Sequence, residues 1–298
     1  MLPHPGGRPG AEANGEEPPV SRTLRNRVAV VTGASSGIGM ATARLMAREG
    51  MKLVLTARRE ERLRAIAQEI EAAGGGAEIV AGDVADPAMA ARLLDAAERR
   101  FGGFDVVFAN AGYGTERGLL ELDADAVRRM FEVNFFSSVD LLRLAAQRLI
   151  GAKHRGHLLL CSSALAKFTL PYFGVYAATK AAQAMVARSL RFELEPYGIE
   201  VSTVHPITTV TEFFDQAQMQ AVRGHSSGTR VPQHAPRLFV QTPERVARAI
   251  IRCLKRPTSE VWTSHTVRLS SGLMTAFPWL LDAILRREAR RTRTHSKS

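Results

Sequence analysis

The sequence predicts a single α/β domain built on a doubly wound parallel sheet of about seven strands. Short runs of β-branched and other apolar residues alternate with longer stretches in which apolar residues recur every three or four positions. This alternation is typical of repeated strand–helix–strand units with right-handed crossovers. With 298 residues, 45% of them apolar, the chain is long enough for one sizeable core.

Seven runs are predicted to be strands because they are short, apolar and bounded by turn formers. They are Val28–Thr32, Lys52–Thr56, Ala77–Ala81, Asp105–Ala109, His157–Cys161, Glu200–Val204 and Glu260–Thr263. The helices predicted between them by the 3.6-residue period are Ile38–Arg48, Glu60–Ala73, Pro87–Phe101, Ala124–Gln147 and Tyr176–Glu195. In such a sheet a ligand lies at the carboxyl ends of the strands, so functional residues are expected there.

The two ends of the chain differ from the middle. Residues 1–23 are rich in Pro, Gly and Glu and are expected to form a disordered leader, ahead of a domain over 24–272 that carries a substrate lid at about 212–241. Residues 273–298 hold an apolar segment and a basic tail. We expect the segment Leu273–Leu285 to pack against the domain or a second subunit, and we favour this over contact with an anionic membrane surface.

Composition excludes several classes of protein. Residues 286–297 contain six basic residues and one acidic residue, so this tail supplies +5 of the net charge of +11, and we do not expect a nucleic-acid surface. Two cysteines, Cys161 and Cys253, are too few for a disulfide framework or a zinc site, so we expect buried thiols, no metal and a cytoplasmic location. His205 and His225 lack partners at metal-ligand spacing and are interpreted as non-catalytic.

A glycine-rich turn follows the first predicted strand and leads directly into a helix. Glycine lets the backbone approach a pyrophosphate closely, and the N–H groups at the helix N-terminus attract its negative charge. A turn that is merely tight is the alternative. The residues predicted to bind a dinucleotide phosphate here are Gly33, Ser35, Ser36, Gly37, Ile38 and Gly39.

The residue after the second strand distinguishes the two nicotinamide cofactors. A carboxylate at this place would accept hydrogen bonds from a ribose 2′-hydroxyl and repel a 2′-phosphate, but the chain has Ala57 there, followed by Arg58 and Arg59. A guanidinium group suits a phosphate dianion. The sequence therefore predicts NADP(H), with Arg58 as the main contact, unless both arginines are simply solvated at the start of a charged helix.

Tyr176 and Lys180 are four residues apart on a predicted helix, so their side chains share one face. An unperturbed tyrosine, with a pKa of about 10, exchanges protons poorly near neutrality. A nearby lysine and the positive nicotinamide of an oxidised cofactor favour the phenolate and are expected to lower the pKa of Tyr176. The phenol could then serve as a general acid or base.

Together these motifs resemble the short-chain dehydrogenase/reductase family over about Arg27 to Trp262, with TGASSGIG as the family's phosphate-binding turn. The resemblance implies a Rossmann-like fold and hydride transfer between NADP(H) and a carbonyl or alcohol. It also implies a catalytic tetrad of Asn134, Ser163, Tyr176 and Lys180. In this tetrad Ser163, preferred to Ser162 by its spacing from Tyr176, hydrogen-bonds the substrate oxygen and Tyr176 exchanges its proton. Lys180 binds the nicotinamide ribose and tunes Tyr176, while Asn134 positions a water.

The resemblance extends to further cofactor residues. Asp83, followed by Val84, matches the family's adenine-contacting acid, although a turn or helix-cap role is nearly as well supported. The run Asn110, Ala111 and Gly112 is similar to the motif that holds the central sheet and lines the cofactor. Pro206 and Thr211 match the loop that meets the nicotinamide, but Ile207 replaces the usual glycine and leaves the path of this loop open.

The substrate is expected to be a small, fairly apolar carbonyl compound or alcohol. Leu165, Phe168, Tyr172 and Phe173 all lie between Ser163 and Tyr176 and would supply the apolar lining. The resemblance implies a homodimer or homotetramer. A catalytically silent NADP-binding sensor or scaffold is the alternative function, since it would need the phosphate-binding turn but not the tetrad.

Overall fold

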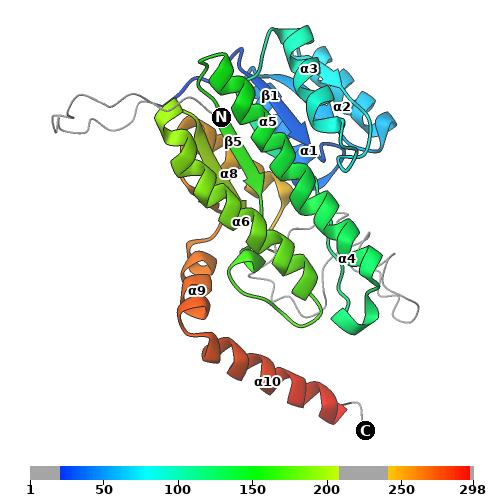
Figure 1. Cartoon of the computed structure of the whole chain (residues 1–298), viewed down its shortest axis with the longest axis vertical. Helices are drawn as coiled ribbons and strands as arrows, with labels where there is room; N and C mark the ends of the chain where they lie inside the picture. Colours follow the sequence, from blue (N-terminus) through cyan, green and yellow to red (C-terminus); the bar gives the residue numbers. More distant parts are fainter. Residues whose placement is uncertain (1–20, 208–240, 296–298) are drawn as a thin grey trace, which may run out of the picture.

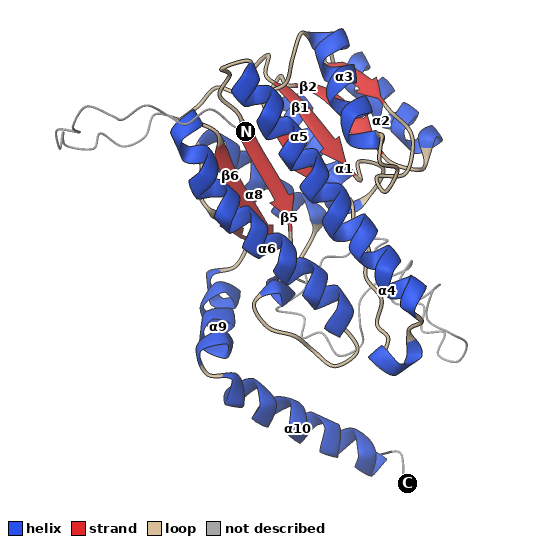
Figure 2. Cartoon of the chain, viewed as in Figure 1, coloured by secondary structure: helices blue, strands red, loops and turns tan. Residues whose placement is uncertain are grey.

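The computed structural model describes residues 21–207 and 241–295, and side chains as far as Arg286. Thr211, nearly all of the predicted lid and residues 1–20 of the predicted leader lie outside the described residues. The centre is a parallel seven-stranded sheet in the order β3-β2-β1-β4-β5-β6-β7, covered by helices on both faces (Figures 1 and 2). The strand order reverses between β1 and β4, so residues at the carboxyl ends of these strands meet at one edge of the sheet.

The seven predicted strands are confirmed, and their ends differ from the prediction by no more than two residues. They are β1 Val28–Thr32, β2 Lys52–Thr56, β3 Gly76–Ile79, β4 Val106–Ala109, β5 His157–Cys161, β6 Glu200–His205 and β7 Glu260–Trp262. Their apolar runs are uninterrupted because both faces are buried. In β1, Ala29 and Val31 join the core under α1 (Gly37–Arg48), α2 (Glu60–Ala72) and α8 (Pro243–Lys255). Val28 and Val30 join the core under the helices of the other face.

That other face is covered by α3 (Met89–Phe101), α5 (Ser137–Gly151) and α6 (Gly174–Leu194). The helix predicted over Ala124–Gln147 is helical throughout, but a π-helical turn that was not predicted lies within it. The structure has α4 (Ala124–Phe131), a π-helical turn η2 (Glu132–Phe136) and then α5. The carbonyl of Asn134 accepts hydrogen bonds from the side chains of Ser138, at 2.8 Å, and of Gln183, which stabilises the wider turn.

The C-terminal part of the described chain contains three helices. Helix α8, which the sequence analysis did not identify, begins after the N-cap Thr242 and packs against α1. It buries Cys253, and β5 buries Cys161, so both cysteines are buried thiols as predicted. Helix α9 (His265–Ala276) buries Val267 and Ser271. Helix α10 (Pro278–His295) contacts α9 and extends away from the domain, so the predicted packing of residues 273–285 over the domain is not seen beyond α9 (Figure 1).

Candidate active site

The glycine-rich turn lies at the end of β1, and two of its glycine positions are packed too tightly to hold a side chain. Gly33 and Gly37 have φ angles of +66° and +54°, in the left-handed region that glycine enters without strain. A Cβ atom at Gly33 would lie 2.9 Å from Nδ2 of Asn110, and one at Gly39 would lie 2.3 Å from the carbonyl oxygen of Gly33. The first turn of α1 carries no acidic residue, so its positive end is available to an anion. These features fit a bound pyrophosphate.

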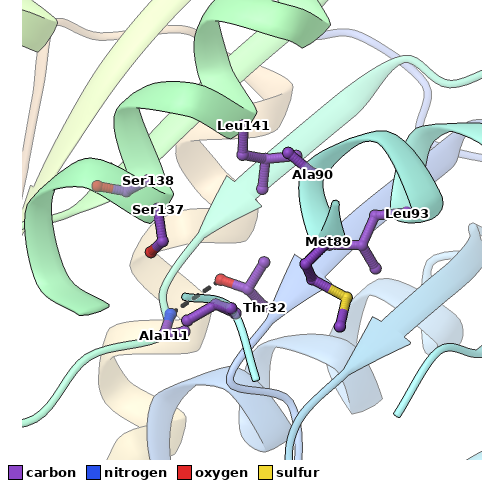
Figure 3. A pocket seen from close by; sticks show the side chains of 9 residues that line it. Thr32, Met89, Ala90, Leu93, Ala111, Ser137, Ser138 and Leu141 are labelled. Carbon is purple, nitrogen blue, oxygen red and sulfur yellow. Dashed lines mark hydrogen bonds between the residues drawn. The ribbon is translucent and has the colours of Figure 1, made fainter. Parts of the chain in front are cut away.

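The turn after β4 is tied to the end of β1 by side-chain hydrogen bonds. Oγ1 of Thr32 accepts from the backbone N–H groups of Asn110 and Ala111, both at 2.9 Å, and Nδ2 of Asn110 donates to the carbonyl of Thr32 at 3.0 Å. Figure 3 shows Thr32 and Ala111 on the wall of a small pocket between α3 and α5. Val84 lines the same pocket, so two of the predicted cofactor residues lie together there.

Tyr176 and Lys180 lie on the first turns of α6 and point toward the end of β5. Nζ of Lys180 lies 5.7 Å from the centroid of the Tyr176 ring and donates a hydrogen bond to the carbonyl of Cys161 at 2.8 Å. Ser163 follows β5, and its side chain hydrogen-bonds with that of Tyr176. Oγ of Ser162 instead donates to the carbonyl of Lys180 at 2.8 Å, so Ser162 supports the helix while Ser163 faces the phenol.

Asn134 is fully buried in the π-helical turn and approaches Lys180 through Gly112. Its Oδ1 accepts from the backbone N–H of Tyr113 at 2.9 Å, and its Nδ2 donates to the carbonyl of Tyr113 at 2.8 Å and to Oγ1 of Thr179 at 3.1 Å. A Cβ at Gly112 would lie 3.1 Å from Oδ1 of Asn134 and 3.4 Å from Nζ of Lys180. The four residues of the expected tetrad are thus gathered at one edge. Tyr113 and Thr179 were missed because each only neighbours a motif residue.

Burial sets the protonation of the two central groups. It raises the pKa of Tyr176 well above its ordinary value, although the hydrogen bond with Ser163 acts in the opposite direction. It also lowers the pKa of Lys180 to about 8. The protein's own groups therefore do not produce the expected lowering of the tyrosine pKa, because burial outweighs the hydrogen bond with Ser163. The phenol keeps its proton at neutral pH, which is the state that a proton donor needs.

The end of β2 carries two arginines near the glycine-rich turn. Arg59 donates to Oγ of Ser35 from Nε at 3.4 Å and from Nη2 at 3.2 Å, so it reaches the turn directly. Arg58 is exposed. Burial raises the pKa of Tyr113, and the positive charges of Arg129 and Arg58 act in the opposite direction. The prediction that Arg58 is the main phosphate contact stays a prediction, and of the two arginines Arg59 is the one with a hydrogen bond to the turn.

Asp83 is engaged by other groups of the protein. Its Oδ1 accepts from the backbone N–H of Ala85 at 3.0 Å, which is the turn role that the sequence left open. Its Oδ2 forms a salt bridge with Arg129 of α4, and both side chains are partly exposed. Such pairs contribute about 0 to 1 kcal/mol, so a ligand could displace Arg129 at little cost. Contact of Asp83 with adenine stays a prediction, and nothing local in the sequence indicated Arg129.

The end of β6 supports the backbone around Ser163. Pro206 is buried and its carbonyl accepts from the N–H of Ala164 at 2.9 Å. Nδ1 of His205 hydrogen-bonds with the carbonyl of Ser163 at 3.0 Å, and the His205 ring stacks on Trp262 with 4.6 Å between centroids. His205 therefore holds the strand end in place.

The sheet, the turn and the gathered polar residues define an oxidoreductase of the dinucleotide-binding type. The chain belongs to the short-chain dehydrogenase/reductase family, since residues 27–221 match the family model described as short chain dehydrogenase. Among curated relatives, dehydrogenase/reductase SDR family member 7B of Bos taurus is 30% identical over 282 residues, which cover 92% of this chain and 85% of that protein.

Two solved structures of the family are similar to this chain along most of its length. A short-chain dehydrogenase/reductase from Burkholderia phymatum in complex with NAD has a TM-score of 0.77 and 27% identity, covering 87% of this chain and 96% of the other. A short-chain dehydrogenase from Sphingobium yanoikuyae in complex with NADPH has a TM-score of 0.72 and 26% identity, covering 86% and 95%. A nicotinamide cofactor is therefore supported. Whether it is NAD(H) or NADP(H) depends on this chain's own residues.

Proposed function

We propose that this protein is an NADP(H)-dependent oxidoreductase that moves a hydride between the nicotinamide and a carbonyl or alcohol substrate, with Tyr176 as the acid or base. The observation that carries the proposal is the convergence of Tyr176, Lys180, Ser163 and Asn134 at the carboxyl edge of the sheet. A sensor or scaffold would need the phosphate-binding turn alone, and chance would not gather these four side chains from β5, α6 and the π-helical turn.

The cofactor, when bound, supplies or accepts the hydride. Ser163 donates a hydrogen bond to the substrate oxygen, and Tyr176 transfers its proton to that oxygen during carbonyl reduction. A phenol whose pKa is raised by burial holds this proton until the oxygen becomes basic, as a general acid in carbonyl reduction must. Lys180 places a positive charge beside the ring and stabilises the phenolate that remains.

Asn134 and Gly112 have positioning roles in this proposal. Asn134 uses its amide to fix the backbone of Tyr113, and Gly112 leaves room for the Lys180 ammonium. Arg58 and Arg59, together with the absence of a carboxylate at Ala57, support NADP(H) over NAD(H) because they favour a 2′-phosphate.

The proposal is tested by following NADPH absorbance with a panel of apolar ketones and aldehydes. Replacing Tyr176 with Phe removes the proton donor, and we expect a loss of about 100-fold to 10,000-fold in kcat, the usual contribution of a general acid. Binding of NADPH, measured by fluorescence, should persist in the variant. If the wild type binds NADPH but reduces no member of the panel and oxidises no alcohol, the sensor function replaces this proposal.

A further inference from the structure

Helices α9 and α10 form an arm, residues 265–295, that presents apolar side chains to solvent. On α9, Val267 and Ser271 face the domain and are buried. Leu269 and Leu273 are four residues apart and lie on the opposite side of the helix, where Leu269 is 68% exposed, and exposed Phe277 follows at the end of α9. The arm therefore has an apolar stripe that the described part of the domain does not cover.

Exposed apolar residues are also present on α10. Trp279 is 64% exposed, Ile284 is also exposed, and the rings of Phe277 and Trp279 meet edge to face with 6.5 Å between centroids. Single exposed apolar residues are common on proteins, but a continuous series of large ones marks an interaction surface. Figure 1 shows α10 extending from the domain with no other element beside it along its length.

The arm lies at the end of the molecule that carries the candidate active site, below the carboxyl ends of the strands (Figure 2). Oγ1 of Thr275 donates to the carbonyl of Lys167 at 2.8 Å, which joins the arm to the segment that follows Ser163. Further exposed apolar residues lie near the site. The backbone N–H of Arg117 donates to the carbonyl of Tyr172 at 2.9 Å, so exposed Tyr172 lies close to the segment that carries exposed Leu120.

The charge next to the apolar residues of the arm indicates which kind of partner would cover them. The apolar half of α10 is followed by the segment 286–297, which holds six basic residues and one acidic residue. Aromatic side chains next to a basic cluster match the interface of a membrane with anionic lipids. A second copy of the chain would bring an equally basic arm and repel it. Among the described residues no helix is long and apolar enough to cross a bilayer, so the arm would lie on the surface.

We propose that the arm binds an anionic membrane surface and holds the active site toward it, so that the enzyme acts on apolar carbonyl compounds or alcohols dissolved in the bilayer. The statement about substrates rests on the proposed function. The statement about membrane binding does not, because it depends on the arm alone.

The test is co-sedimentation of the full chain with vesicles of phosphatidylcholine and phosphatidylglycerol at a ratio of about 3:1, with phosphatidylcholine vesicles for comparison. We expect binding to the anionic vesicles that weakens at high salt. The double variant Phe277→Ser/Trp279→Ser should bind at least about tenfold more weakly. Phe192→Ser is the matched control, because Phe192 is 58% exposed but lies on α6, outside the arm, and this variant should bind as the wild type does.

Three results would overturn the proposal. They are no sedimentation of the wild type with anionic vesicles, equal binding to both kinds of vesicle, and an equal loss of binding in the Phe192→Ser control. A dimer that the arm variant disrupts, in a wild type that does not bind vesicles, would assign the surface to a second copy instead. Tyr176→Phe should bind vesicles normally, so failure of the proposed chemistry would be recognised separately.

Discussion

In the proposed function, the choice of cofactor depends on the single side chains of Arg58 and Arg59. Replacing Arg58 with Ala should weaken NADPH binding about tenfold to a hundredfold, since a hydrogen bond to a charged group contributes about 1.5 to 3 kcal/mol. Arg59→Ala should act in the same direction, because Arg59 already reaches Ser35 in the turn. Binding of NADH should change little in either variant. Titration by cofactor fluorescence measures the dissociation constants of NADPH and NADH for both variants.

Arg62→Ala serves as the control for these variants, because Arg62 is an exposed arginine of α2 one turn further from the strand end. It should leave both affinities unchanged. If Arg58→Ala and Arg59→Ala both retain full NADPH affinity, the preference for the phosphorylated cofactor has no basis in these arginines.

Tyr172 occupies a backbone conformation that a tyrosine rarely adopts. The N–H of Phe173 donates to the carbonyl of Leu170 at 3.2 Å, Pro171 takes the second position of this turn, and Tyr172 takes the third with a φ angle of +68°. This is the type II turn position that suits Gly or Asn. Because the Tyr172 side chain is 59% exposed, Tyr172→Asn should raise the free energy of unfolding by about 1 kcal/mol in urea denaturation.

Leu120→Asn provides the comparison for Tyr172, since Leu120 is fully exposed and a change there should leave stability unaltered. A lower stability of Tyr172→Asn would mean that contacts of the ring outweigh the strain.

Among the elements, the π-helical turn carries the amide of Asn134, which holds the backbone at Tyr113. Asn134→Ala would leave the partly buried N–H and carbonyl of Tyr113 without this partner, and each unsatisfied group costs about 1 to 3 kcal/mol when it is kept from water. We expect the free energy of unfolding to fall by about 3 kcal/mol. Thr179→Val removes only one acceptor of the amide and should cost about 1 kcal/mol. Equal, small losses in both variants would show that the backbone at Tyr113 does not depend on the Asn134 amide.

The elements also show how far the sequence could predict the structure. Strands were located to within two residues because burial on both faces leaves an apolar run that turn formers interrupt. The motif residues at the strand ends were identified by their resemblance to the family's motifs. The π-helical turn was missed because it depends on Gln183, 49 residues away, and the pairing of Arg129 with Asp83 joins residues 46 apart. No local pattern encodes such contacts, and the exposure of the arm depends on what lies beside it.

At the scale of the whole molecule, two buried histidines at opposite ends of the sheet couple stability to pH. Burial lowers the pKa of His157, at the start of β5, to about 3 and that of His205, at the end of β6, to about 4. Because both values lie below the ordinary pKa of about 6.5, the folded state favours the neutral rings. The stability that they contribute is complete above about pH 6.5 and is lost as the pH falls toward 4 and 3.

The expected size of this effect makes it measurable. For a folded pKa of about 4, as for His205, linkage gives a loss of about 2 kcal/mol at pH 5, and His157 adds a similar amount. Urea midpoints at pH 7.5 and pH 5 should therefore differ strongly in the wild type, and His205→Asn should remove about half of the difference. Stability is compared only above about pH 4.5, because Glu260 contributes a loss of its own at lower pH. Hydrogen bonds from Lys167 and Trp262 outweigh burial and lower the pKa of Glu260 to about 2. If His205→Asn and the wild type lose the same stability between these two pH values, His205 takes up its proton as readily in the folded chain as in the unfolded one.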